Sequence, residues 1–118
     1  MARVKRAVNA RKSRKQTLER AKGYYGNKSR SARAANEQVM KSGQYAFRDR
    51  RAKKGEFRRL WIQRINAGCR IYDMSYSQFI AGLNAANIEV DRKILADMAV
   101  HDIDSFGRLV QAAKVALG

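Results

Sequence analysis

The sequence is poor in the residues that build metal centres, disulfide frameworks and membrane spans. Its 118 residues include one Cys, one His and no Pro. One Cys and one His cannot form a zinc finger or a disulfide framework, and no apolar run approaches the roughly 20 residues that span a bilayer. The basic opening segment has no apolar stretch behind it, so we expect no secretory signal. The zinc-ribbon, secreted disulfide-rich and membrane classes are excluded, and the single thiol fits a reducing compartment.

Signatures of catalysis are missing as well. The sequence has no phosphate-binding Walker loop, dinucleotide-binding glycine motif or paired-carboxylate arrangement. His101 stands beside Asp102 without a nucleophile signature, and we interpret it as a surface loop residue. Cys69 shares a predicted helical face with Ile65, so we interpret it as a small core residue. The sequence therefore predicts a protein that is not an enzyme, with no cofactor, no metal ion and no small-molecule substrate.

Acidic residues are scarce, above all in the first half of the chain. The sequence holds 26 Lys and Arg against 10 Asp and Glu, a net charge of +16 at pH 7. Residues 1–60 carry 20 of the basic side chains and four of the acidic ones, so the rest of the chain is neutral. So large a charge must be neutralised by counterions or by a polyanionic partner. Nucleic acid is the leading candidate for that partner.

Large apolar residues divide in the opposite way. Val, Ile, Leu, Met, Phe and Trp number 7 in residues 1–56 and 22 in residues 57–118. Only the second part can bury enough apolar surface to form a core, because the first cannot offset the entropy of ordering its chain. The sequence predicts a basic extension over residues 1–56, suited to binding nucleic acid, and a globular domain over residues 57–118.

Apolar spacing in the second part is helical throughout. Ile62, Ile65, Cys69 and Tyr72 recur on one helical face. Three more helices are expected after N-terminal caps, the first of them a capping box. These caps are Ser75 with Gln78, Asp91, and either Asp102 or Asp104. The side chains expected to point inward are Tyr76, Phe79, Ile80 and Leu83, then Ile94, Leu95 and Met98, then Phe106, Leu109, Val110, Ala113 and Leu117.

The first part also favours helices. Ala, Arg, Lys and Gln are abundant, and only glycines interrupt them. We expect a mobile or extended start, a helix near residues 10–22, a break at residues 23–26 and a long helix from about residue 29 to residue 72. The predicted fold is all-α: a long basic N-terminal helical extension followed by a small globular helical domain.

Positive charge surrounds the long helix between residues 48 and 59. At about 100° per residue, its seven basic side chains cover most of the circumference, while Asp49 and Glu56 share one narrow stripe and are expected to pair with Lys53 or Arg59. No apolar face is available for a membrane surface or a coiled coil. Charge on nearly all sides suits a helix threaded between phosphate backbones better than one that reads a single groove.

Basic side chains are the main candidates for RNA contact, since they neutralise phosphates and release condensed counterions. In the first part they are Arg3, Lys5, Arg6, Arg11, Lys12, Arg14, Lys15, Arg20, Lys22, Lys28, Arg30, Arg33, Arg48, Arg50, Arg51, Lys53, Lys54, Arg58 and Arg59. Tyr24 and Tyr25, between two glycines, either stack on unpaired bases or pack the first helix against the second. Trp61 is interpreted as a residue at the edge of the core, with stacking on a base as the alternative.

Arg92 and Lys93 are unusual because cations in the first turn of a helix oppose its dipole. A phosphate docked at that helix start would explain their position. Ser75 and Ser77 offer a comparable site at the preceding helix, with ordinary surface residues as the alternative.

Four blocks of the sequence resemble a known family. The run YAFRDRRAKKGEFRRLWIQRINA (residues 45–67) is similar to the hallmark of the L-twenty family of bacterial large-subunit ribosomal proteins. RAKGYYG (residues 20–26), MSYSQFIAGL (residues 74–83) and DRKILADMA (residues 91–99) resemble its other blocks in the same order. The resemblance covers essentially the whole chain.

This resemblance implies a structural protein of the large ribosomal subunit in the cytoplasm. It implies a helical extension penetrating 23S ribosomal RNA, a globular domain on the same RNA, an early assembly role, and neighbouring large-subunit proteins as partners. In some members the C-terminal domain represses translation of its own mRNA. By motif, the implied RNA contacts are Arg48, Arg50, Arg51, Arg58, Arg59, Trp61, Arg64, Arg92 and Lys93. The alternative function is a free nucleic-acid-binding regulator of nucleoid or repressor type.

Overall fold

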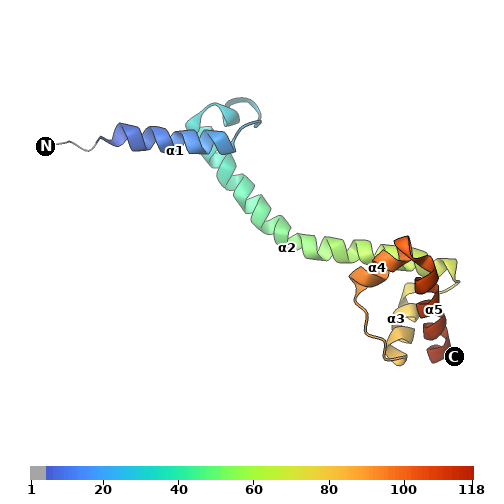
Figure 1. Ribbon diagram of the computed structural model, residues 1–118. Helices are drawn as coiled ribbons and strands as arrows, with labels where there is room; N and C mark the ends of the chain where they lie inside the picture. The colour runs from blue at the N-terminus through green and yellow to red at the C-terminus, as the bar shows by residue number, and fades with distance from the viewer. Residues whose placement is uncertain (1–4) are drawn as a thin grey trace. The chain divides into compact units, whose positions relative to one another are not determined.

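The computed structural model describes residues 5–118, which are almost entirely helical (Figure 1). The elements in order are α1 (Arg6–Arg20), the 3-10 turn η1 (Gly26–Ser29), α2 (Ala32–Ile71), α3 (Tyr76–Ala85), α4 (Arg92–His101) and α5 (Ile103–Leu117). Residues 5–118 contain no strand, so the all-α prediction is confirmed. The chain divides into two compact units, one ending at Arg51 and one spanning Ala52–Gly118, and α2 contributes to both.

The first two helices begin at different residues from those expected. Helix α1 starts at Arg6, four residues earlier than predicted, because no Gly or Pro interrupts the helix-compatible residues there. Its N-cap, Lys5, makes no side-chain capping hydrogen bond, so no local signal marked this start. Helix α2 starts at Ala32 because the residues before it are taken up by η1.

The first unit buries very little. Ala21 and Ala35 are its only buried hydrophobic residues among those described. The turn between α1 and α2 is tied to α2 by a hydrogen bond of 2.8 Å between the hydroxyls of Tyr24 and Ser42. Two small buried side chains and one such bond give this unit little to hold it together beyond its own helical hydrogen bonds.

The caps of the second unit are those the sequence predicts. The Ser75 hydroxyl accepts a hydrogen bond from the Gln78 backbone, and the Gln78 side chain accepts one from the Ser75 backbone, which completes the capping box. The Asp91 carboxylate accepts from the backbone N–H of Ile94 at 2.9 Å. Of the two candidates before α5, Asp102 is the cap.

Helices α2 and α3 end in the same way, through a residue in the left-handed region. Asp73 (φ 58°) follows α2, and Asn87 (φ 57°) follows α3. After α2, the backbone N–H of Met74 donates to the carbonyl of Cys69 at 3.0 Å, as in a Schellman motif. Asp and Asn tolerate this conformation better than most residues, so these two positions set where the chain turns.

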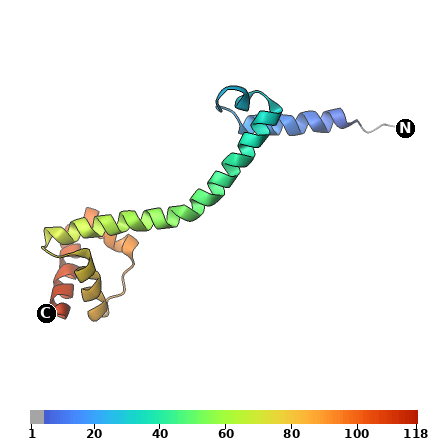
Figure 2. The same cartoon turned by 180° about the vertical axis from the view of Figure 1, so that it is seen from behind.

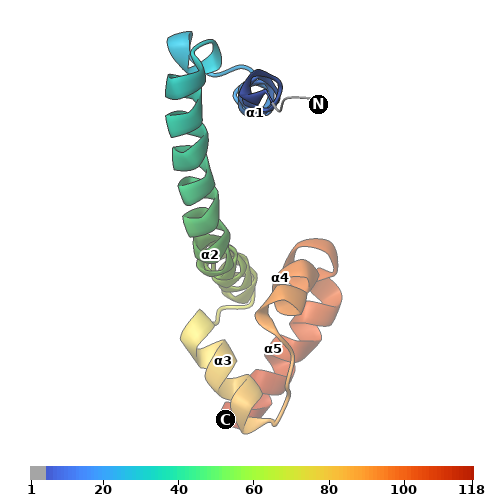
Figure 3. The ribbon, with the colours of Figure 1, turned by 90° about the vertical axis from the view of Figure 1, so that its left-hand side faces the viewer.

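The core of the second unit lies between α3 and α5, which run side by side in Figures 2 and 3. Helices α2 and α4 contribute further side chains to it. The rings of Phe79 and Phe106 lie with centroids 5.2 Å apart at its centre. The buried members are Ile65, Cys69, Met74, Phe79, Leu83, Leu95, Ala96, Phe106, Val110 and Ala113. The predicted core position of Cys69 is confirmed.

Two of the side chains predicted to point inward do not. Ile94 is 51% exposed and Leu117 is 49% exposed. In α4 the buried residues are Leu95 and Ala96, and Ile94 lies outside this buried face. Leu117 is the last residue of α5, one turn beyond Ala113, where the buried face ends.

Candidate nucleic-acid interface

The basic stretch of α2 has no buried side. Every residue from Gly43 to Arg59 is exposed. A helix gains most of its stability in a protein from packing one face on a core, and this stretch packs on none. All seven of its basic candidates, Arg48, Arg50, Arg51, Lys53, Lys54, Arg58 and Arg59, are therefore open to a partner on any side.

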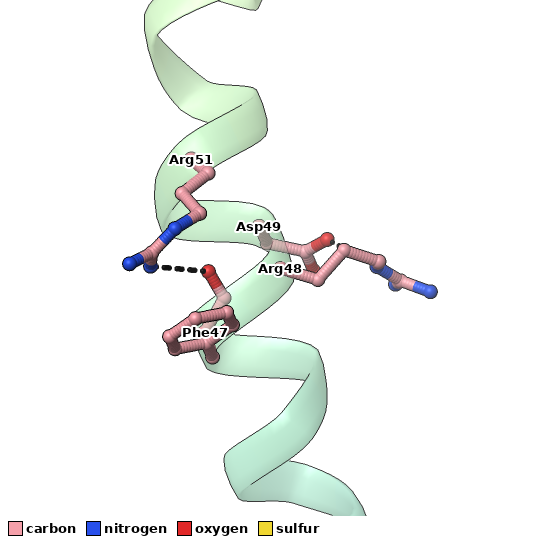
Figure 4. A network of polar contacts seen from close by, with 4 residues as sticks. All are labelled: Phe47, Arg48, Asp49 and Arg51. Atoms are coloured by element: carbon pink, nitrogen blue, oxygen red, sulfur yellow. Dashed lines mark hydrogen bonds and ion pairs between the residues drawn. The ribbon is translucent and has the colours of Figure 1, made fainter.

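The expected pairing of the acidic stripe is wrong. Asp49 accepts a hydrogen bond from the Nε atom of its neighbour Arg48 at 2.9 Å, rather than from Lys53 or Arg59 (Figure 4). That hydrogen bond raises the pKa of the Arg48 guanidinium. Glu56 forms no ion pair within residues 5–118. The acids therefore neutralise few of the cations on this helix.

Aromatic rings hold several of the cations instead. The Arg51 guanidinium lies 3.6 Å from the ring centroid of Phe47 and donates a hydrogen bond of 3.5 Å to the Phe47 carbonyl (Figure 4). The Tyr45 ring is approached by Arg48 at 4.8 Å and by Lys41 at 5.6 Å. These pairs are three or four residues apart, the spacing at which side chains meet on a helix. This spacing is visible in the sequence, so these pairs could have been predicted from it.

The two tyrosines of the turn have different surroundings. Tyr24 is partly buried and its hydroxyl is hydrogen-bonded to that of Ser42, which favours the packing alternative for this residue. Tyr25 is 92% exposed. The flanking glycines, Gly23 (φ 85°) and Gly26 (φ 58°), adopt backbone conformations that side chains disfavour, and they fix the turn that presents Tyr25.

The remaining candidates of the first unit are also exposed. They are Lys5, Arg6, Arg11, Lys12, Arg14, Lys15, Arg20, Lys22, Lys28, Arg30 and Arg33. A hollow of about 710 Å³ groups Arg11, Arg14, Lys15 and Lys22 near Ser29. Closely spaced cations of this kind favour an anion such as phosphate. Arg3 lies outside the described residues.

In the second unit, one groove between α2 and α4 brings together Trp61, Arg64 and Lys93. Trp61 is partly buried and packs against the core, in agreement with its interpretation as a core-edge residue. Ser75 and Ser77 lie at the start of α3 and do not line this groove.

Arg92 has a structural partner that the sequence did not indicate. Its Nε atom donates to the hydroxyl of Tyr76 at 2.8 Å, which links the start of α4 to α3. The N–H of Ile94 is already occupied by the Asp91 carboxylate. The hydrogen bond to Tyr76 therefore explains the position of Arg92 in the first turn of α4 without a bound phosphate. Lys93, in contrast, is exposed.

The described residues offer little for other chemistries. Residues 5–118 contain no group of three or more His, Cys, Asp and Glu side chains that could hold a metal ion. His101 is exposed, as expected, but it is the last residue of α4 rather than a loop residue, and its Nδ1 atom pairs with Asp97 at 2.9 Å. No helix within residues 5–118 has both the length and the hydropathy needed to cross a membrane.

Comparison with protein families agrees with this picture of an exposed basic helix joined to a small helical core. The family model described as ribosomal protein L20 matches residues 3–109. The match includes α2 entirely and most of the second unit. The chain therefore belongs to the ribosomal protein L20 family, whose members are structural proteins of the large ribosomal subunit that bind ribosomal RNA and are not enzymes.

Proposed function

We propose that this chain binds 23S ribosomal RNA directly and supports early assembly of the large subunit. The observation that carries the proposal is the stretch of α2 from Gly43 to Arg59, which is exposed on every side and strongly basic. A helix that bound RNA along one face would have cations on that face alone. Charge on all sides suits enclosure between several phosphate backbones.

The two parts of the chain divide the task. The basic extension, residues 1–56, supplies phosphate contacts that carry no sequence information by themselves. Beyond residue 60 the chain has no net charge, so most of the domain over residues 57–118 cannot rely on general attraction to RNA. Its fixed shape supplies the anchor that selects the place on the RNA, and the extension then follows.

Aromatic side chains in the extension add contacts that phosphates cannot provide. Tyr25 stacks on an unpaired base, because its ring is exposed and its turn is fixed by two glycines. Phe47 and Tyr45 hold the guanidinium groups of Arg51 and Arg48 in place before RNA arrives. A cation that is already positioned loses less conformational entropy on binding.

The proposal includes the expected cellular setting. The chain works in the cytoplasm, within the ribosome, beside neighbouring large-subunit proteins. Binding of its own mRNA by the second unit, and repression of that mRNA, form part of the proposal. The core of the second unit involves no described residue of the first, so this unit does not need the extension in order to fold and bind RNA.

Sedimentation tests the central proposal. The chain is expected to co-sediment with large subunits at one copy per particle and to remain bound in salt that strips loosely held basic proteins. Crosslinking within purified particles is expected to map residues 48–59 to 23S ribosomal RNA. Recovery only in the ribosome-free or nucleoid fraction would contradict the proposal and favour a free regulator.

A variant pair refines this test. Replacing Arg50 and Arg51 with Gln removes two exposed cations from the extension and is expected to lower retention in high salt. The matched control replaces Arg70 and Arg108 with Gln, two exposed cations of the second unit outside the extension. Equal retention of both variants would show that the charge of α2 does not hold the chain in the particle.

A further inference from the structure

A groove between α2 and α4 has the composition of a nucleotide site. Its volume is about 480 Å³, within the range of about 300–1,000 Å³ typical of small-molecule sites. Two residues of α2 and the start of α4 form its walls. The lining residues that matter here are Trp61, Arg64, Asp91, Lys93, Ile94 and Asp97.

Trp61 gives the groove a rigid aromatic wall. The indole packs against the core on one side, and the Phe57 ring lies 6.5 Å from it at an interplanar angle of 40°. An aromatic ring that the core holds in place is a platform on which a nucleic-acid base can stack. The exposed side chain of Ile94 adds an apolar surface to the same groove.

The charges in the groove are of both signs, and they are not paired with each other. Arg64 and Lys93 are exposed and form no ion pair within residues 5–118. Both aspartates have partners elsewhere: Asp91 caps α4 and Asp97 pairs with His101. The two cations are therefore available for a phosphate, while carboxylate oxygens can accept hydrogen bonds from the N–H groups of a base.

We propose that this groove binds a single unpaired nucleotide, with its base stacked on Trp61 and its phosphate held by Arg64 and Lys93. The inference rests on the proposed function, because the nucleotide belongs to the RNA that the chain binds. It assigns to the second unit a site that recognises a base that is not stacked on its neighbours. An apolar peptide segment would offer no anionic partner to Arg64 or Lys93, so it fits the groove less well.

The test uses the full chain and free mononucleotides as probes. Trp61 is the only Trp, so its indole N–H gives a single cross-peak in a ¹⁵N-correlated NMR spectrum. Guanosine 5′-monophosphate, which carries N–H donors, is expected to shift this peak saturably through the ring current of its base. Ribose 5-phosphate carries the phosphate without a base, and it is expected to leave the peak in place.

Variants locate the site. Arg64→Gln and Lys93→Gln are each expected to weaken the nucleotide-induced shift by about tenfold in affinity, the effect of losing one charge-assisted contact. Both side chains are exposed, so neither change disturbs the core. The matched control is Arg70→Gln, an exposed cation of α2 that does not line the groove, and its affinity is expected to stay unchanged.

Three outcomes would overturn the proposal: no saturable shift with the nucleotide, an equal shift with ribose 5-phosphate, or an equal loss of affinity in Arg70→Gln. None of these outcomes touches the proposed function, because co-sedimentation with the large subunit is measured independently. Loss of co-sedimentation together with an unchanged nucleotide-induced shift of the Trp61 peak would instead contradict the proposed ribosomal role.

Discussion

Burial changes the acid–base chemistry of the one thiol in the chain. Cys69 is fully buried in the core of the second unit, and this burial raises its pKa to about 11. An uncharged thiol fits an apolar site, whereas a thiolate there would lack both solvent and a partner. The reactivity of the residue is therefore suppressed by its position in the fold.

We predict that this shift makes stability depend on alkaline pH. The pKa of Cys69 is higher in the folded chain than in the unfolded chain, so its contribution is complete below about pH 9 and is lost as pH rises towards 11. The loss amounts to about 1–3 kcal/mol of unfolding free energy. Chemical denaturation of the second unit at pH 7 to 11 measures it.

The control for this prediction is Cys69→Ala, which has no group to titrate at that position. Tyr and Lys side chains also titrate in this range, so the quantity of interest is the difference between the two proteins. That difference is expected to shrink above pH 9. A difference that stays constant up to pH 11 would contradict the raised pKa.

We predict that substitutions of the two neighbouring tyrosines affect different properties: RNA binding for Tyr25 and the stability of the turn for Tyr24. Tyr25→Ser is expected to weaken RNA binding by about 1–3 kcal/mol, the usual value of one stacked base, without changing the stability of the free chain. Tyr24→Phe keeps the ring but removes the hydrogen bond to Ser42, which costs the turn about 0.5–1.5 kcal/mol. Filter binding measures the RNA affinity of Tyr25→Ser. Amide hydrogen exchange of residues 21–31 measures the stability of the turn in Tyr24→Phe.

At the scale of helices, the contact between α3 and α5 depends on a missing side chain. A Cβ atom added at Gly82 would lie 2.6 Å from the Cβ atom of Ala113 and 2.7 Å from its carbonyl oxygen. The two helices can approach this closely only because residue 82 has no side chain. The backbone of α5 cannot move aside without disturbing Val110 and Phe106 in the core.

We predict that Gly82→Ala destabilises the second unit by at least about 1–3 kcal/mol through overpacking. The matched control is Gly55→Ala, because Gly55 lies in a helix and nothing surrounds its Cβ position within 4 Å. This control is expected to be neutral or to stabilise α2 by about 0.5–1 kcal/mol. Thermal unfolding followed by circular dichroism compares them, and equal melting temperatures would contradict the packing argument.

Local signals were sufficient to predict most of the helices. Ser75 with Gln78 and Asp91 mark helix starts through bonds to residues three positions away, so the sequence alone reveals them. The start of α1 was missed because Lys5 leaves no such signal. The exposed position of Ile94 depends on which side of α4 meets the core, and spacing within a single helix does not determine that.

Contacts between distant residues were not predictable in the same way. The Tyr72 hydroxyl donates to the carbonyl of Ile103 at 3.0 Å, and the Nζ atom of Lys114 donates to the carbonyl of Tyr72 at 2.6 Å. These bonds join residues more than 30 positions apart, and they exist only once the helices have packed. The groove beside Trp61 is of the same kind, since α2 and α4 each supply part of it.

At the scale of the whole molecule, the two units differ in what holds them together. Within residues 5–51 there are 15 basic side chains, three acidic ones and two buried alanines. The second unit has ten buried residues in one core. We therefore expect the second unit to be folded in the absence of RNA and the first to open readily.

Amide hydrogen exchange on the full chain tests this difference. Without RNA, amides of residues 5–51 are expected to exchange much faster than those of the core residues on α3 and α5, because their helices gain little from packing. Bound RNA is expected to slow exchange in the first unit most. Strong protection of residues 32–51 in the free chain would contradict the expectation.

The near absence of buried residues in the first unit also determines how substitutions there would be tolerated. In the second unit a change such as Gly82→Ala is resisted by the surrounding core. From Gly43 to Arg59, no core encloses the substituted residue, so the stability of the free chain depends there mainly on helix propensity and changes little between residues that favour a helix. A mutational scan that measures folding would therefore show that most substitutions in this stretch are tolerated. The same scan, measuring incorporation into ribosomes, would show that few of them are.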